Sequence, residues 1–128
     1  MVREDTLTPL LRGDLDTVSF IRDYVEFRID YNVLRCMTGP IVRTGRNEWR
    51  FPGPGSRDAL CGLIDGVVKE VEVTDAGIEL RMDLERTLIL PLDRKSRTRP
   101  DGRVSPEAVH LVPADERGSL DVAGMVIW

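Results

Sequence analysis

The fold is decided by two stretches of sequence, Val25-Glu26-Phe27-Arg28-Ile29-Asp30 and Ile78-Glu79-Leu80-Arg81-Met82-Asp83. In both, apolar and charged residues alternate strictly, which is typical of a β-strand with one face in a core and the other in water. The glutamate, the arginine and the aspartate occupy the same places in the two stretches. The sequence therefore predicts a β-rich fold built around two similar strands.

Further strands are expected on both sides of each stretch. Residues 17–22 precede the first stretch, and the apolar run 33–37 follows it after a turn at Tyr31-Asn32. The second stretch is preceded by the β-branched run 67–74 and followed by the apolar run 87–90. Residues 120–128 are expected to form a last strand.

Two short helices are expected between the strands. Ser56 is placed as an N-cap, with Asp58 in the first turn and apolar residues at helical spacing as far as Gly66. Ser105 is placed as a second N-cap, with Pro106 at the first helical position and Pro113 ending the helix. Residues 42–55 and 94–103 are expected to be loops.

The order of these elements suggests an internal repeat. Residues 17–66 and 67–128 each read as three strands, a loop and a short helix, so the expected fold is α+β, dominated by β-structure and pseudo-two-fold around one core. Two explanations remain open: duplication of one unit, favoured by the identical outward residues, and the shared physics of half-buried strands. Residues 1–14 show no sustained period and are expected to be a loose N-terminal arm.

Length and composition are those of one ordinary globular domain. The chain has 128 residues, of which 41% are hydrophobic and 31% charged, enough to build a core without disulfide staples. No apolar run is long enough to span a membrane, and the N-terminus is acidic where a signal peptide would be basic. The expected location is cytoplasmic. The formal net charge of -4 argues against a protein whose whole surface binds nucleic acid.

No set of residues requires a particular chemistry. Cys36 and Cys61 lie in apolar stretches and read as a buried thiol pair, and His110 is far from both in sequence. The spacing of these three residues fits no zinc site, and neither cysteine has the flanks of a nucleophile. The acidic residues that can be placed alternate with arginine on strands, which favours cross-strand charge pairs over a catalytic carboxylate pair. We therefore expect no catalytic residues, no metal and no cofactor.

Two weaker candidates have simpler explanations. Gly53-Pro54-Gly55-Ser56 runs into a helix start and could cradle an anion, but it lacks the lysine and the spacing of a phosphate loop, so a turn with a cap is favoured. The apolar C-terminal residues 126–128 are expected to pair as a buried strand, with an exposed edge that forms a homodimer as the alternative.

The two loops offer the best candidate surface. They are rich in arginine, and the first also carries aromatic residues that could stack on a ligand or anchor a protein partner. The predicted binding residues are Arg43, Arg46, Trp49, Arg50 and Phe51 in the first loop and Arg94, Lys95, Arg97 and Arg99 in the second. The alternative is that long surface loops are simply charged.

Residues 23–30, 56–64 and 104–112, with the second hairpin between them, resemble small uncharacterised β-rich actinobacterial proteins from position 18 onward. That group carries no activity to transfer, although some comparable small bacterial proteins are immunity factors that bind a toxin. The leading hypothesis is therefore a non-catalytic module that binds a protein partner, as an immunity or regulatory factor. The alternative is a module that binds an anion or nucleic acid through the two arginine-rich loops.

Overall fold

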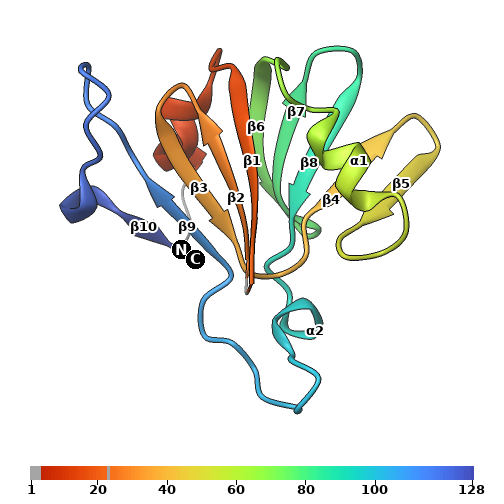
Figure 1. The fold of residues 1–128 in the computed structure, drawn as a ribbon. Helices are drawn as coiled ribbons and strands as arrows, with labels where there is room; N and C mark the ends of the chain where they lie inside the picture. Colours follow the sequence, from red (N-terminus) through yellow and green to blue (C-terminus); the bar gives the residue numbers. More distant parts are fainter. Residues whose placement is uncertain (1–3, 23) are drawn as a thin grey trace.

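The protein, described here from a computed structural model for residues 4–22 and 24–128, consists of two antiparallel five-stranded sheets (Figure 1). Two short α-helices and two 3-10 helices accompany them. The prediction of an α+β fold dominated by β-structure is confirmed.

The elements fall into two successive sets. The first set is η1 (Glu4–Leu10), β1 (Leu15–Ile21), β2 (Tyr24–Ile29), β3 (Asn32–Cys36), β4 (Ile41–Thr44) and β5 (Asn47–Arg50). The second set is α1 (Ser56–Cys61), β6 (Val68–Thr74), β7 (Gly77–Met82), β8 (Arg86–Leu90), α2 (Arg94–Arg97), β9 (Val109–Val112), η2 (Val122–Gly124) and β10 (Val126–Ile127).

The two sets exchange their last two strands. The strand order is β1-β2-β3-β9-β10 in one sheet and β6-β7-β8-β4-β5 in the other. Each sheet is thus a three-stranded meander from one set, extended by a two-stranded hairpin from the other. Neither set can complete a sheet alone, so both are needed for the fold.

The registers of the two meanders also agree. Val18 pairs with Phe27 in the first meander, and Val71 pairs with Leu80 at the corresponding position of the second. Each first strand has an irregularity at the same place, between Leu15 and Thr17 and between Val68 and Glu70. Register follows from which face is buried, but a shared bulge does not, so the two meanders match in more than their hydrophobic pattern.

A pseudo-two-fold axis passes between the starts of β1 and β6, which lie side by side in Figure 1. Asp14 and Val67 form an isolated antiparallel bridge there. The flanking hydrogen bonds are reciprocal: Leu15 N donates to Gly66 O at 2.9 Å, and Val68 N donates to Gly13 O at 3.1 Å. The two sheets are therefore joined at one end by main-chain hydrogen bonds.

The expected loose N-terminal arm is wrong for the residues that the structure describes. Residues 4–10 form η1, in which Leu7 and Leu10 are completely buried. Leu60 and Leu63, in and after α1, are buried in the same way and stand at the same distance before Gly66 as the η1 leucines before Gly13. The structural repeat thus begins with these helices, so α1 opens the second unit rather than closing the first. Residues 1–3 lie outside the described residues.

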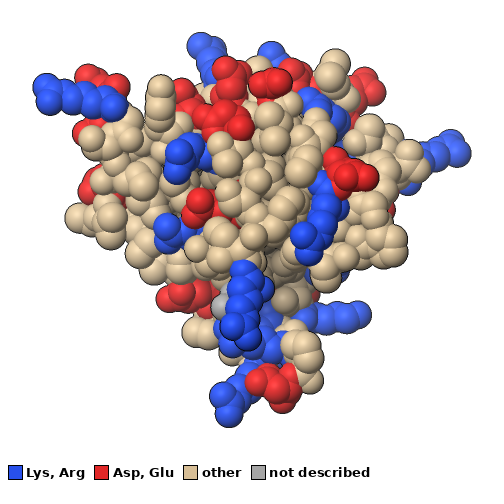
Figure 2. Space-filling view, in the orientation of Figure 1, with Lys and Arg blue, Asp and Glu red and all other residues tan. Residues whose placement is uncertain are grey.

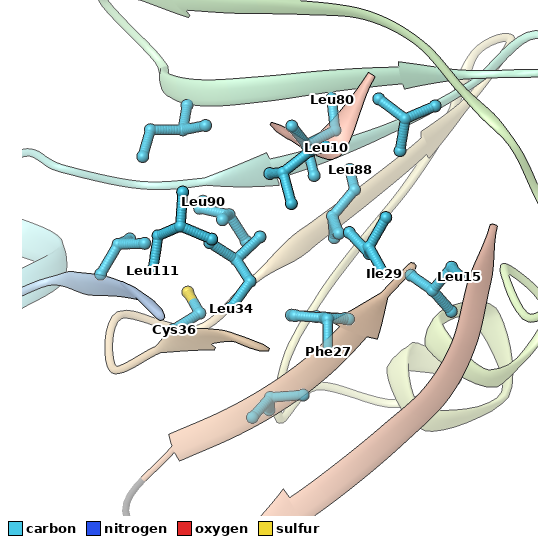
Figure 3. Close-up of a cluster of buried hydrophobic side chains, with 14 of the residues drawn as sticks. Leu10, Leu15, Phe27, Ile29, Leu34, Cys36, Leu80, Leu88, Leu90 and Leu111 are labelled. Carbon is cyan, nitrogen blue, oxygen red and sulfur yellow. The ribbon is translucent and has the colours of Figure 1, made fainter. Parts of the chain in front are cut away.

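Side chains from both sheets form one core, part of which is shown in Figure 3. Phe27 of β2 and Leu34 of β3 face this core from one sheet, and Leu80 and Leu88 face it from the other. Burial of each such side chain stabilises the fold by about 1.5–3 kcal/mol. A single hydrophobic cluster therefore holds both sheets together.

Several predicted elements differ in the structure. Gly55 rather than Ser56 is the N-cap of α1, α2 lies within the loop expected over 94–103, and the strand expected over 120–128 is limited to β10. Two larger differences concern strand pairing. The helix expected from Ser105 is wrong: residues 109–112 form β9, which pairs with β3 through Leu34 and Leu111. The loop expected over 42–55 is wrong for its first half, which forms the β4–β5 hairpin. In both places pairing with the other unit supplies hydrogen bonds that local propensity does not reveal.

The expected cross-strand charge pairs are confirmed. Arg35 bonds Glu26 at 3.0 Å, and Arg81 contacts Glu70 at 3.1 Å and Glu72 at 2.5 Å. Glu79 departs from the prediction of a solvent-facing side chain, because it is buried between neighbouring strands and accepts a hydrogen bond from Thr74.

The symmetry predicts that the chain tolerates circular permutation at the junction between its two units. We expect a permutant opened between Pro54 and Gly55, with Trp128 joined to Met1 through two glycines, to fold with a free energy of unfolding within about 2 kcal/mol of the original. Its new link, residues 1–3 plus the glycines, matches the length of segment 52–56. Chemical denaturation measures the difference. A permutant opened between Arg81 and Met82, inside β7, is the control and is expected not to fold; equal stability of the two would contradict the proposed symmetry.

Candidate functional site

The symmetry is broken where each meander leads into the next strand. Residues 37–40 join β3 to β4 directly, whereas the equivalent connection between β8 and β9 runs over residues 91–108 and contains α2. In Figure 1 this longer connection extends below both sheets. The two arginine-rich segments are therefore not equivalent: the first is a hairpin, and the second is an extended connection.

Internal hydrogen bonds hold the connection 91–108 in place. Arg97 ties its two ends together, because its Nε donates to Leu92 O at 2.8 Å and its Nη1 donates to Pro106 O at 2.9 Å. Arg99 N donates to Arg103 O at 2.8 Å, closing a tight turn. The segment is thus a structured loop, and Arg97 has a structural role in it.

A cavity of about 450 Å³ lies between this connection and the ends of β2 and β3. Its walls come from four parts of the chain: the β1–β2 turn with the start of β2, the end of β3 with the connection 37–40, the residues after β5, and the connection 91–108. The lining residues are Arg22, Tyr24, Val25, Cys36, Met37, Thr38, Gly39, Pro40, Phe51, Pro52, Ser96, Arg97, Thr98, Arg99, Pro100 and Ser105.

Among the described residues, every charged side chain that lines the cavity is an arginine: Arg22, Arg97 or Arg99. No ion pair is formed by Arg22 or Arg99 with any residue of the described ranges. In Figure 2 basic side chains gather at this end of the molecule, over α2 and the following loop, with some acidic side chains among them, while the opposite end carries acidic and basic side chains together. The cavity therefore lies beside a local cluster of basic side chains in a chain whose net charge is negative.

Arg50 links the β4–β5 hairpin to the cavity wall. Its Nη2 donates to Ser96 Oγ at 2.5 Å, and Ser96 Oγ in turn donates to Asp93 Oδ1 at 2.7 Å. Hydrogen bonds from Ser96, with the charge of Arg50, lower the pKa of Asp93, so this carboxyl is ionised near neutral pH. The chain of contacts fixes the start of α2 against the hairpin.

The predicted binding residues separate into three places. Phe51, Arg97 and Arg99 line the cavity, and Arg50 contacts its wall through Ser96. Arg94 and Lys95 are exposed on α2, and Arg46 is exposed in the β4–β5 turn. Arg43 is paired with Glu48 at 3.1 Å. The structure thus brings together four of the nine residues.

The two aromatic residues of the first segment are partly buried. Trp49 is half-buried, packs against the core and lies against Gly55. The Phe51 ring stacks on Phe20 with centroids 5.5 Å apart, and the Arg57 guanidinium lies 5.5 Å from the Phe51 centroid. Much of the aromatic surface expected to meet a partner is therefore used within the fold.

The expected buried thiol pair is wrong, because Cys36 is buried and Cys61 is exposed on α1. Burial raises the pKa of the Cys36 thiol to about 11.

We expect iodoacetamide at pH 8 to alkylate Cys61 of the native protein quickly, and Cys36 only after denaturation. Mass spectrometry after a timed quench measures this; Cys61→Ser should abolish the fast reaction. Fast alkylation of both thiols in the native protein would contradict this prediction and show that the cavity opens readily on the side of Cys36.

His110 has no catalytic partner in Cys36. Cys36 pairs with Val109 across β3 and β9, so the His110 side chain lies on the opposite face of the sheet from the thiol. Its Nε2 is 2.6 Å from Glu107 Oε2.

In the part of the chain that the structure describes, no three His, Cys, Asp or Glu side chains are grouped to hold a metal. Within the same residues, no helix has both the length and the apolar character needed to cross a bilayer.

Sequence reasoning missed several residues of the cavity. Arg22 comes from the β1–β2 turn, Tyr24 is the first residue of β2, and Ser105 is placed by the sequence as a helix cap. Arg22 stands alone between a strand and a turn, so its local sequence contains no signal for a site. Arg22 comes close to the connection 91–108 only because the two units exchange their hairpins.

Three comparisons with known proteins found no relative from which a function could be inferred. A scan against protein-family models, a search of curated proteins and a search of solved structures each gave no match to this chain.

Proposed function

We propose that this protein is a binding protein whose cavity beside α2 takes a small ligand carrying an anionic group. One observation carries the proposal: the cavity presents Arg22 and Arg99, neither ion-paired within the described residues, and Arg97 is the one other charged group in its described lining. A guanidinium group matches the fork geometry of a carboxylate or a phosphate.

The size and lining of the cavity support a small ligand. Its volume of about 450 Å³ falls within the range of roughly 300–1,000 Å³ that is usual for small-molecule sites. Met37 and Phe51 give the cavity an apolar part beside its arginines. Such a combination suits an anion that belongs to a larger organic molecule.

The position of the cavity supports the same proposal. The two units share strand order and register, and the connection 91–108 is the main departure from that plan on this end of the molecule. Loops carried on a rigid scaffold are the usual place for binding residues. The connection supplies Ser96, Thr98, Arg99 and Ser105 to the cavity.

Calorimetric titration with inorganic phosphate at constant ionic strength tests the proposal. We expect saturable binding that the double substitution Arg22→Ala, Arg99→Ala weakens by about tenfold or more, since each charge-assisted hydrogen bond contributes about 1.5–3 kcal/mol.

The matched control is Arg43→Ala, Arg46→Ala, which removes the same charge from the β4–β5 hairpin and leaves the cavity intact. We expect this variant to bind phosphate as the unaltered protein does. Equal weakening by the two double substitutions would show that phosphate senses net charge alone, and the proposed site would then be wrong.

A further inference from the structure

The threonine and serine hydroxyl groups of the cavity wall are already used as donors within the protein. Thr38 Oγ1 donates to Pro91 O at 2.6 Å, Thr98 Oγ1 donates to Arg94 O at 2.9 Å, and Ser105 Oγ donates to Glu107 O at 2.8 Å. A carbonyl oxygen can only accept, so each of these hydroxyl hydrogens is committed.

Ser96 is committed in the same way. Its Oγ donates to the ionised carboxylate of Asp93 at 2.7 Å and accepts from Arg50 at 2.5 Å. These serine and threonine hydroxyls therefore offer a ligand their lone pairs and no hydrogen. Donors toward a ligand come instead from the guanidinium groups of Arg22 and Arg99, with the phenolic hydroxyl of Tyr24 as a further donor.

A bare inorganic anion would use only part of such a cavity. It would accept from the arginines, but it could not satisfy the oxygen acceptors of the wall or cover the apolar lining of Met37 and Phe51. A ligand that fits all three features carries an anionic group, an apolar body, and N–H or O–H donors of its own.

We infer that the cavity binds a nucleoside monophosphate; this inference rests on the proposed function and names its ligand class. The phosphate faces Arg22 and Arg99, the base lies against the apolar lining, and amino or hydroxyl groups of the base and ribose donate to wall oxygens such as Thr98 Oγ1. The fit requires no base-specific contact, because hydroxyl oxygens accept from any N–H or O–H group.

Calorimetric titration of the full chain with AMP, GMP, CMP, UMP, ribose 5-phosphate and inorganic phosphate tests the inference. We expect at least one nucleotide to bind about tenfold tighter than ribose 5-phosphate, because burial of the base against the apolar lining adds to the phosphate contacts. Thr98→Val, which keeps the shape of the side chain and removes its oxygen, should weaken that nucleotide by about threefold to tenfold. The same substitution should leave phosphate binding unchanged.

The outcomes separate the two proposals. If phosphate binds in an Arg22- and Arg99-dependent manner while no nucleotide binds tighter than ribose 5-phosphate, the ligand class is wrong and the anion site stands. If Thr98→Val weakens nucleotide and phosphate equally, the wall does not read the donors of the ligand, and the inference is overturned. If neither phosphate nor any nucleotide binds, both proposals fail.

Discussion

Replacing Phe27 with alanine is expected to lower the free energy of unfolding by about 3–5 kcal/mol, the usual cost of emptying a large buried aromatic site. Phe27 is completely buried on β2, where Val18 and Leu34 are its cross-strand neighbours. It lies in the core that both sheets share (Figure 3). Loss of the Phe27 side chain leaves a cavity that the rigid strands on either side cannot close. The destabilisation should therefore affect the whole fold.

Urea denaturation followed by circular dichroism measures this loss. Phe20→Ala is the control, because Phe20 is only partly buried and stacks on Phe51 at the rim of the core. We expect it to cost about 1–2 kcal/mol. Similar losses at the two positions would show that the interior around Phe27 is not the tightly packed core described here.

A second large effect is expected from Gly77→Ala. Gly77 opens β7 with φ near 130°, and a Cβ atom there would lie 2.2 Å from the main-chain oxygen of Leu90. Both partners are backbone atoms in paired strands, so relief requires β7 and β8 to separate locally. We expect a loss of at least about 3 kcal/mol from backbone strain and broken pairing together.

Gly45→Ala is the matched control for the backbone effect. Gly45 also has a positive φ, of 59°, but a Cβ atom there meets nothing within 4 Å. Its substitution should cost about 1–2 kcal/mol, the price of a left-handed conformation alone. Thermal and urea denaturation of both variants give the comparison. A Gly77→Ala protein no less stable than Gly45→Ala would contradict the close approach of β7 to Leu90.

The meander strands could be predicted because burial dictates their pattern. In β2, Val25, Phe27 and Ile29 are completely buried, as the alternation predicts, and β7 follows the same rule at its apolar positions. These strands pair with sequence neighbours across short turns. Local sequence is therefore sufficient for them.

The exchanged hairpins could not be predicted because their partners lie far along the chain. β4 pairs with β8 and β9 pairs with β3. Ser105, Pro106 and Glu107 have the pattern of a helix start but do not begin a helix. Instead, the Ser105 hydroxyl donates a hydrogen bond to Glu107 O in an irregular segment. A capping pattern indicates a helix only when the residues after it are free to form one.

The repeat and the candidate site were each predictable in part. The match of Glu26, Arg28 and Asp30 with their counterparts pointed to two equivalent meanders. The helix η1 went unnoticed because it carries Pro9 and shows no clear period, so α1 was assigned to the end of the first unit. Arg97 and Arg99 of the second segment were among the predicted binding residues and line the cavity, but its lining also includes Arg22 from the β1–β2 turn. Tertiary pairing between the units creates this cavity, so no single segment encodes it.

The central claim is that an anion binds in the cavity formed by the connection 91–108, and NMR spectroscopy tests it most directly. Uniformly nitrogen-15-labelled protein would be titrated with inorganic phosphate at constant ionic strength, after backbone assignment. The account predicts saturable shifts of the amide signals of Gly39, Thr98 and Arg99, with those of Gly45 and Arg46 at the hairpin tip unchanged. Shifts that fail to saturate, or that centre on the β4–β5 hairpin, would contradict it.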